Sequence, residues 1–340
     1  MKHQFRGGRL SRRQLLARGG ALAAAAGAAS LAGPGARATG DAHRGQVHHN
    51  ELDHGGNLVV GDVDLSVFDP TAYMTNFDYG TTSTLPDGRT LREWKMVAFD
   101  REIEVAPGVK FSAWTYNGQV PGPTLRCTEG DRLKIHFVNA GSHPHTIHFH
   151  GIHAAIMDGV FEVVPPGAEF TYEFDAEPFG LQLYHCHTAP LRRHIHKGLY
   201  GVFIIDPREP RPPALELVMT MNGFDTNFDG ENEVYAVNTV AFHYVRHPIR
   251  LRVGELVRIY LVNMTEFDPV NSLHTHANFF REYRTGTSLT PNNFTDITVL
   301  GQAERAVLEL TYKFPGLFMF HAHQTEFSEL GWTGMFEVVP

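Results

Sequence analysis

The chain has 340 residues, of which 42% are hydrophobic and 19% are charged, and its formal net charge is −8. This length is sufficient for two domains of ordinary size, and the composition is typical of a soluble globular protein. Positions 1–38 hold seven Lys or Arg and no Asp or Glu, so removing them changes the net charge from −8 to −15, which argues against nucleic acid or an anionic membrane as a partner.

The first 38 residues have the features of a targeting segment. Ser11–Leu16 (SRRQLL) matches a twin-arginine signal, an alanine-rich apolar run follows from Ala21 to Ala32, and Ala36-Arg37-Ala38 offers a cleavage site of the A-x-A type. The apolar run is too short and too rich in alanine to favour an uncleaved membrane anchor. We therefore expect export by the twin-arginine route to the periplasm or the exterior, with no membrane attachment after cleavage.

Residues 39–90 are rich in Gly, Asp and His and show little periodicity, so we expect an N-terminal arm there. Beyond it, strands are expected at Lys95–Val105, Val109–Tyr116 and Leu133–Val138, because apolar residues alternate between Gly and Pro turns and no helical period is sustained. The sequence therefore predicts an all-β chain of the sandwich type.

The Pro-rich segment Asp206–Pro213 is expected to be a stiff linker between two domains, residues 91–207 and 208–340. The second of these domains repeats the first. The corresponding segments are Leu125–Asn139 with Ile249–Asn263, His148–His150 with His274–His276, Gly180–His187 with Gly316–His323, and 201–203 with 334–336.

The stretch Tyr184–His187 (YHCH) predicts a metal site of unusual form. In a strand, successive side chains point to opposite faces, so His185 and His187 share one face and Cys186 takes the other. One thiolate with two histidines and a weak axial neighbour is the ligand set of a blue-copper electron-transfer centre.

The stretch H-x-x-H-x-H at residues 145–150 supplies the matching histidines. His148 and His150 are two residues apart and therefore lie on one face of a strand, whereas His145 is three residues before His148 and lies on the other. His145 can therefore join Cys186 and a downstream histidine, while His148 and His150 join the two histidines that flank the cysteine.

The second domain keeps its paired histidines and loses the thiolate side. Cys186 corresponds to Ala322, His145 corresponds to Asn271, and no histidine follows His323. This split favours one mononuclear copper in the first domain and one multi-histidine cluster shared between the domains.

With these motifs the chain resembles the two-domain, laccase-like multicopper oxidases. The resemblance covers about residues 90–340 and implies two cupredoxin Greek-key β-sandwich domains, with blue copper in the first only. It also implies four coppers per subunit and one-electron oxidation of phenolic or aromatic amine donors, coupled to four-electron reduction of dioxygen to water.

The resemblance implies a ligand set for each copper. The type 1 copper would take His145, Cys186 and His194, with Leu199 at its axial side. The type 2 copper would take His148 and His274. The type 3 pair would take His150, His185, His187, His276, His321 and His323.

Two assignments rest on narrower grounds. Residues 188–193 make the loop after Cys186 longer than in laccases, but the step of five from His194 to Leu199 is kept, so His194 is preferred to His196. Reduction of dioxygen needs protons, and Asp158 and Glu326 are the candidate proton donors because they follow cluster histidines closely.

Other functions and assemblies remain open at this point. The loop length and the two-domain plan are also those of copper-containing nitrite reductases, and a non-catalytic electron carrier or copper-storage protein is a third possibility. The resemblance implies a homotrimer with clusters between subunits, against a monomer with intrachain pairing. Four basic side chains beside the type 1 ligands indicate either tolerance for anionic donors or a solvated loop; they are Arg192, Arg193, His196 and Lys197.

Overall fold

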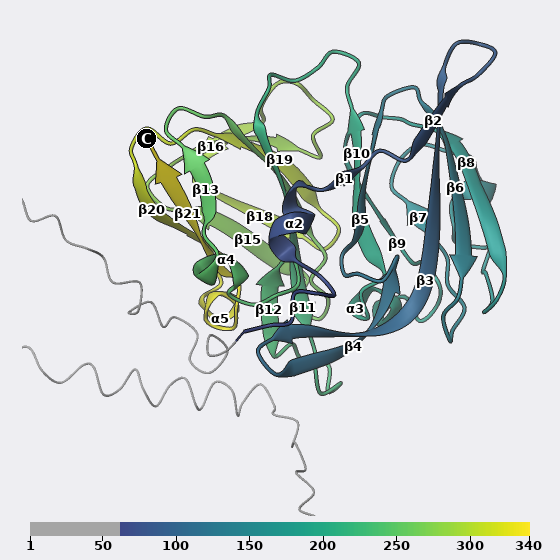
Figure 1. The fold of residues 1–340 in the computed structure, drawn as a ribbon, viewed down its shortest axis with the longest axis horizontal. Helices are drawn as coiled ribbons and strands as arrows, with labels where there is room; N and C mark the ends of the chain where they lie inside the picture. The colour runs from purple at the N-terminus through teal and green to yellow at the C-terminus, as the bar shows by residue number, and fades with distance from the viewer. Residues whose placement is uncertain (1–61) are drawn as a thin grey trace, which may run out of the picture.

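The computed structural model describes residues 62–340, and the predicted signal peptide and the first part of the predicted arm lie outside these residues. The described chain is built from strands with a few short helices, so the predicted all-β class is confirmed (Figure 1). None of the helices within residues 62–340 is both long enough and apolar enough to cross a membrane.

The first domain contains two sheets, one with the order β1-β5-β10-β9-β7 and one with the order β2-β3-β6-β8, to which β4 pairs through β3. Its strands are β1 (Phe77–Asp78), β2 (Thr81–Thr84), β3 (Thr90–Ala106), β4 (Val109–Tyr116), β5 (Gly122–Thr128), β6 (Arg132–Asn139), β7 (His148–Phe149), β8 (Glu169–Asp175), β9 (Gly180–His185) and β10 (Tyr200–Asp206). Its helical segments are α2 (Pro70–Thr75), η3 (Ala155–Met157) and α3 (Leu191–His196).

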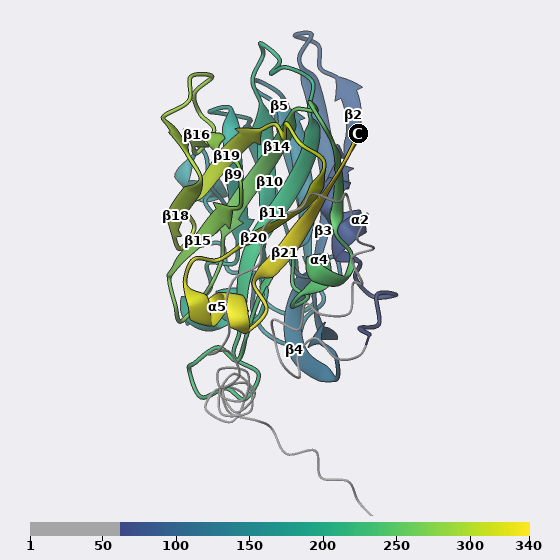
Figure 2. The same ribbon diagram turned by 90° about the vertical axis from the view of Figure 1, so that its left-hand side faces the viewer.

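The second domain contains two sheets, with the strand orders β12-β11-β14-β19-β16-β17 and β13-β21-β20-β15-β18. In Figure 2 this domain faces the viewer. Its strands are β11 (Leu215–Phe224), β12 (Val234–Val237), β13 (Ile249–Arg252), β14 (Val257–Asn263), β15 (Val270–Thr275), β16 (Phe280–Arg284), β17 (Asn293–Thr295), β18 (Ile297–Gly301), β19 (Arg305–Leu310), β20 (Gly316–His321) and β21 (Thr333–Val339). Two short helices complete it, α4 (His243–Arg246) and α5 (Thr325–Glu329).

The repeat seen in the sequence is a repeat of strand pairing. The parallel pairs β3–β6 and β5–β10 of the first domain correspond to β11–β14 and β13–β21 of the second. The antiparallel pairs β7–β9 and β15–β20 correspond as well, and they place His148 opposite His185 and His274 opposite His321. Equivalent histidines therefore meet at equivalent places in both domains.

Burial along the strands follows from their position. On β6 buried and half-buried side chains alternate, as expected for a strand with one face on the core. On β9 every side chain is buried, because β9 lies in the middle of its sheet and the second domain packs against it. Cys127 on β5 is buried in the core of the first domain, where it packs as a small hydrophobic residue.

Polar contacts tie the two domains together. Arg126 on β5 binds Asp206 at 2.7 Å and Glu216 on β11 at 2.6 Å. Arg305 on β19 donates to the carbonyl oxygen of Leu181 on β9 at 2.8 Å. One hydrophobic cluster also includes residues of both domains, so the two sandwiches share a packed interface.

Candidate metal centre

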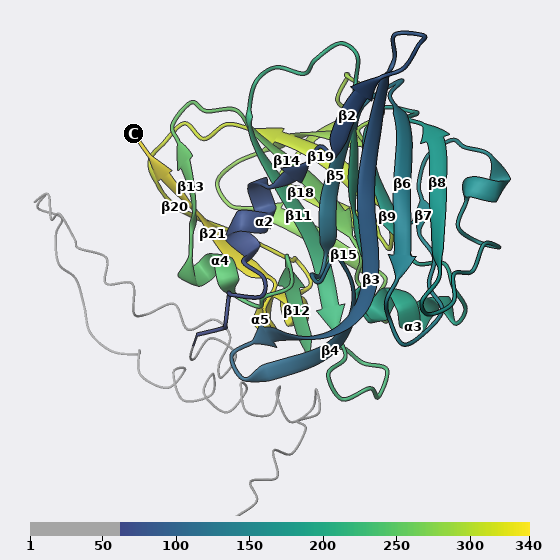
Figure 3. The same cartoon turned by 45° about the vertical axis from the view of Figure 1, so that its right-hand side comes forward.

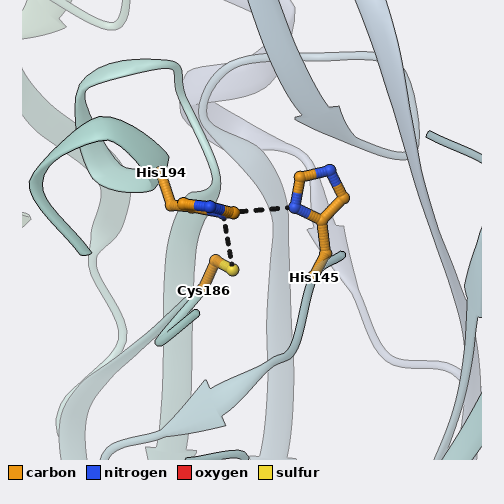
Figure 4. A group of neighbouring side chains, drawn as sticks. All are labelled: His145, Cys186 and His194. Atoms are coloured by element: carbon orange, nitrogen blue, oxygen red, sulfur yellow. Dashed lines mark hydrogen bonds between the residues drawn. The ribbon is translucent and has the colours of Figure 1, made fainter. Parts of the chain in front are cut away.

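The thiolate site is a buried triangle of ligand atoms at the end of β9 (Figure 4). The Nδ1 atom of His194 lies 3.2 Å from the Sγ atom of Cys186 and 3.2 Å from the Nδ1 atom of His145. His194 comes from α3, Cys186 follows β9, and His145 precedes β7, so three separate segments meet here. All three side chains are buried.

The surroundings of Cys186 hold the thiol in place. The backbone N–H of Thr146 donates to Sγ at 3.4 Å, and the N–H of Cys186 donates to the carbonyl oxygen of Leu199 at 2.9 Å. Leu199 is fully buried in the same hydrophobic cluster as Cys186. Trp114 covers the two histidines, with ring centroids 5.2 Å from His145 and 4.8 Å from His194.

The structure distinguishes His194 from His196. His194 faces Cys186, whereas the Nε2 atom of His196 accepts a hydrogen bond from the backbone N–H of Asp225 at 3.2 Å. His196 therefore points toward the second domain and lies outside the thiolate site.

The other four predicted copper ligands of the first domain form a second group, separate from the thiolate site. The Nε2 atoms of His150 and His185 face each other at 3.2 Å, and the ring of His148 lies 5.1 Å from both rings. The ring of His187 lies 5.3 Å from that of His148. The strand alternation that separates Cys186 from its two neighbours is thus present in the structure.

The second domain contains a matching group. The Nε2 atoms of His276 and His321 face each other at 3.0 Å, and the ring of His274 lies 5.5 Å from that of His321. The ring of His323 lies 5.4 Å from that of His274. His276 and His323 are exposed to solvent in the single chain.

Backbone carbonyls orient these imidazoles. The Nδ1–H of His148 donates to the carbonyl oxygen of Asp158 at 2.7 Å, and that of His274 donates to the carbonyl oxygen of Asp296 at 2.9 Å. His185 and His321 donate in the same way to the residues that follow them, Cys186 and Ala322. An imidazole that donates through Nδ1 presents the lone pair of Nε2, which is the usual arrangement around a bound metal.

Burial keeps many of these imidazoles in the neutral form that binds metals. Loss of hydration, aided by the neighbouring histidines, lowers the pKa of His145 and His185 to about 4 and that of His150 to about 3. The pKa of His194 is lowered to about 4 by burial and by nearby positive charge.

The two histidine groups are separate within one chain. His148, His150 and His185 have ligand atoms close enough to share an ion, and so do His274, His276 and His321. Among residues 62–340, no set of metal-binding side chains combines histidines from both groups. Each domain therefore presents its own group of histidines.

The carboxylate candidates differ in their placement. The Oδ1 atom of Asp158 lies 3.1 Å from Nδ1 of His148 and 3.9 Å from Nε2 of His153. Glu326 lies in the first turn of α5, three residues after His323. In the second domain it is Asp296 that takes the place of Asp158, with its Oδ2 atom 3.8 Å from Nδ1 of His274.

Three residues of this region were missed in the sequence. Asp296 is the equivalent of Asp158 in the second domain, and it could have been found by extending the internal repeat beyond the histidine motifs. His153 follows His150 by three residues, but histidine spacing alone does not show that it approaches Asp158. Trp114 precedes the motifs by a whole strand, and no local pattern connects it to His194.

The donor sets fit copper. A thiol with two neutral imidazoles in a buried site, and groups of three or more imidazoles, are ligands that copper accepts readily. Comparison with known proteins agrees with this chemistry. Residues 100–210 and residues 210–340 each match a domain family described as multicopper oxidase. The chain belongs to the multicopper oxidase family.

Solved structures show how far the resemblance extends. One multicopper oxidase of known crystal structure has 58% sequence identity to this chain, with a TM-score of 0.79. The match covers 80% of this chain and 97% of the chain of that oxidase. The blue copper oxidase of Nitrosomonas europaea is 29% identical, with a TM-score of 0.66, over 73% of this chain and 86% of the other. These neighbours support the cupredoxin-like, two-domain architecture that the resemblance implied.

Curated relatives include a different activity. The copper-containing nitrite reductase of Neisseria meningitidis is 28% identical over 250 residues, which are 67% of this chain and 64% of the relative. The chain thus spans somewhat less than two thirds of the length of that relative. The proteins that this chain resembles therefore include both oxidases and nitrite reductases.

Proposed function

We propose that this multicopper oxidase is laccase-like: it oxidises phenolic or aromatic amine donors by one electron at a time and reduces dioxygen to water with four electrons. The observation that carries the proposal is the pair of matching histidine groups, one in each domain. Together they supply eight imidazoles, which is more than a single copper ion can use and suits a cluster of three.

The residues would divide among four coppers in two kinds of site. His145, Cys186 and His194 would hold the type 1 copper, with Leu199 on its axial side. His148 and His274 would hold the type 2 copper, and the remaining six cluster histidines would hold the type 3 pair. When bound, copper supplies one-electron acceptance at the thiolate site and several electrons together at the cluster.

The chain itself contributes orientation, a short connection and a proton route. Cys186 lies between His185 and His187 in one strand segment, so the thiolate site and the cluster are joined by a few covalent bonds. Trp114 and the buried Leu199 exclude water from the thiolate. The carboxylate of Asp158, whose Oδ1 atom lies 3.1 Å from Nδ1 of His148, would pass protons toward the oxygen-reducing site. Glu326 stays a second candidate for this task.

We further propose a homotrimer exported by the twin-arginine route to the periplasm or the exterior, with no membrane attachment after cleavage. The half-sites support the assembly, because neither domain can complete the cluster and a contact between domain 1 of one chain and domain 2 of the next closes into a ring. Exposed apolar side chains lie beside both halves, as expected for surfaces that become buried. They include Ile152, Ile156 and Phe161 in the first domain and Phe279, Phe294 and Phe314 in the second.

Nitrite reduction is the alternative, favoured by the relatives and by the long segment that forms α3. A nitrite reductase uses a single type 2 copper with an aspartate near it; here His148 stands at the position of that aspartate, and His187 and the H-x-H pairs would be surplus to such a site. A non-catalytic electron carrier would need only the thiolate site, so the cluster histidines argue against that function too.

The decisive experiment measures copper per chain, oxygen consumption with a phenolic donor, and nitrite reduction in separate assays. The proposal expects about four coppers per chain and oxygen uptake at one molecule per four electrons withdrawn from the donor. Two coppers per chain, with nitrite turnover and no oxygen uptake, would contradict it.

A further inference from the structure

A cavity of about 620 Å³ lies beside α3, where the first domain meets the second. Figure 3 shows α3 next to the loop that joins β11 to β12. The cavity is lined by Arg192, Arg193, His196 and Lys197 from the first domain and by Asp225, Phe228 and Phe267, among others, from the second. None of these residues is among the proposed copper ligands.

Positive charge is concentrated on one wall of the cavity. Lys197 is only 7% exposed, and within residues 62–340 no carboxylate forms an ion pair with its Nζ atom or with the guanidinium of Arg193. Arg192 has Glu266 at 3.8 Å. The Nζ atom of Lys197 contacts aromatic rings but no carboxylate, and an anion bound in the cavity would offset the cost of burying its charge.

Acidic side chains in the lining do not supply this partner. The carboxylate of Asp225 already accepts hydrogen bonds from the backbone N–H groups of Phe228, Asp229 and Gly230. The carboxylate of Asp229 is exposed and accepts from the N–H of Glu231. The cationic wall therefore remains available to a ligand.

Aromatic rings form the remaining walls. The Nζ atom of Lys197 lies 4.9 Å from the ring centre of Phe228, and the guanidinium of Arg192 lies 4.2 Å from that of Phe267. Both phenylalanines have positive φ, 65° for Phe228 and 69° for Phe267. Bulky residues rarely adopt this left-handed conformation, and such strain is found where a site requires a side chain in a fixed place.

The cavity is one side chain away from the thiolate site. The ring of Trp114 lies 4.8 Å from that of His194 and 5.1 Å from the guanidinium of Arg193. Its backbone N–H donates to the carbonyl oxygen of Lys197 at 2.8 Å. A substrate in the cavity would thus contact Arg193 and Lys197, both of which contact Trp114, the residue that packs on the proposed type 1 ligand His194.

We propose that this cavity binds the reducing substrate and selects small aromatic anions, such as phenols that carry a carboxylate. The carboxylate would lie against Lys197 and Arg193, and the ring would lie between Phe228 and Phe267. This inference rests on the proposed oxidase function and names its substrate class. Binding here adds no redox step to the proposed reaction.

The first test is a calorimetric binding experiment on the copper-loaded protein with benzoate, benzamide and acetate, none of which is expected to be oxidised. Benzoate should bind at least about tenfold more tightly than benzamide, which lacks the charge, and than acetate, which lacks the ring. Lys197→Gln and Arg193→Gln should each weaken benzoate several-fold. Lys95→Gln removes the same charge from an exposed position on β3 and should leave binding unchanged.

Two results with the wild-type protein would overturn the proposal. One is equal affinity for benzoate and benzamide, and the other is equal affinity for benzoate and acetate. Because Lys197 is buried and its variant could fail to fold, the exposed Arg193→Gln variant decides the charge dependence alone if necessary, and unchanged benzoate binding there would also contradict the proposal.

A second test compares kcat/KM for 4-hydroxy-3-methoxybenzoate with that for its methyl ester. The wild-type ratio of acid to ester should exceed one, should fall about tenfold in Lys197→Gln, and should stay the same in Lys95→Gln. A ratio of one or less in the wild type would overturn the selectivity. If the wild type oxidised neither phenol, the proposed function would fail, and the benzoate experiment would still decide whether the cavity binds aromatic anions.

Discussion

The thiol of Cys186 lies 3.2 Å from one imidazole nitrogen of its site, and His185 belongs to a separate group of metal-binding side chains. A copper–thiolate bond there should make the loaded protein blue, and Cys186→Ser should abolish the colour while the copper of the cluster is retained. Visible absorption and copper content of both proteins test this. A blue Cys186→Ser protein would show that the thiolate site has been assigned wrongly.

Leu199 is buried beside Cys186 and has no atom that can donate to copper. If copper is bound with Leu199 on its axial side, as proposed, the oxidised centre would gain no axial electron density, and its reduction potential should be comparatively high. Leu199→Met should lower the potential in a redox titration followed by the blue absorption. Leu199→Ile is the matched control, since it keeps an apolar side chain of equal size and should shift the potential less. A potential that stays constant or rises in Leu199→Met would exclude Leu199 as the axial residue.

At the scale of residues, the sequence predicted which side chains of one strand share a face, but it did not predict contacts between separate segments. The parity of residues 145–150 and 185–187 predicts which side chains share a face, because that alternation is a local property of strands. The proximity of Asp158 to His153, and of Trp114 to His194, depends on how separate segments pack. No sequence period encodes those contacts.

At the scale of elements, Arg126 joins β5, β10 and β11. Its side chain is 10% exposed and binds Asp206 and Glu216, which are 31% and 21% exposed. Removing one partner of a buried ion pair leaves charge uncompensated, so Arg126→Met should destabilise the protein by about 3 kcal/mol. The thermal unfolding midpoint should fall by roughly 5 °C at constant copper and protein concentration.

Arg132→Met is the control for this change. Arg132 also binds two carboxylates, Glu173 and Asp175, but all three side chains are more than 30% exposed. Water screens such pairs, and their loss should cost at most about 1 kcal/mol. Equal destabilisation by the two variants would mean that Arg126 does not act as a buried link between the domains.

The same link predicts a dependence on pH. Burial alone would raise the pKa of Glu216, but hydrogen bonds from Arg126 and Tyr260 and the nearby positive charge outweigh burial and lower it from its ordinary value of 4.5. A carboxylate with a lowered pKa stabilises the folded state above the unfolded pKa, and this contribution is lost as the pH falls through the folded pKa. Unfolding midpoints measured between pH 7 and pH 3 should therefore fall less in Arg126→Met than in the wild type.

The elements themselves were largely predictable. Alternation and turn residues indicated β3, β4 and β6, and the internal repeat indicated the matching strands of the second domain. The helix α3 was not expected, because residues 188–193 appeared only as an inserted loop. Its side chains pack against Trp114 and against Phe267 of the second domain, contacts that no local pattern encodes.

At the scale of the whole molecule, the histidines of each group face one another within their own domain. His150 faces His185, His276 faces His321, and His276 is exposed to solvent. A cluster shared between chains would join the first group of one subunit to the second group of the next. His150→Ala and His276→Ala should then each be inactive, because every interface would lack one ligand.

Mixing these two variants tests the shared cluster directly. If they are unfolded together, refolded and loaded with copper, an interface is intact only when it combines the unaltered halves of both, so about one quarter of wild-type activity should return. Wild-type protein taken through the same procedure controls for refolding, and each variant refolded alone should stay inactive. Intrachain pairing predicts no recovery, because every chain would still carry one altered half. An inactive mixture beside a fully active wild-type control would therefore contradict the shared cluster and leave the single chain as the catalytic unit.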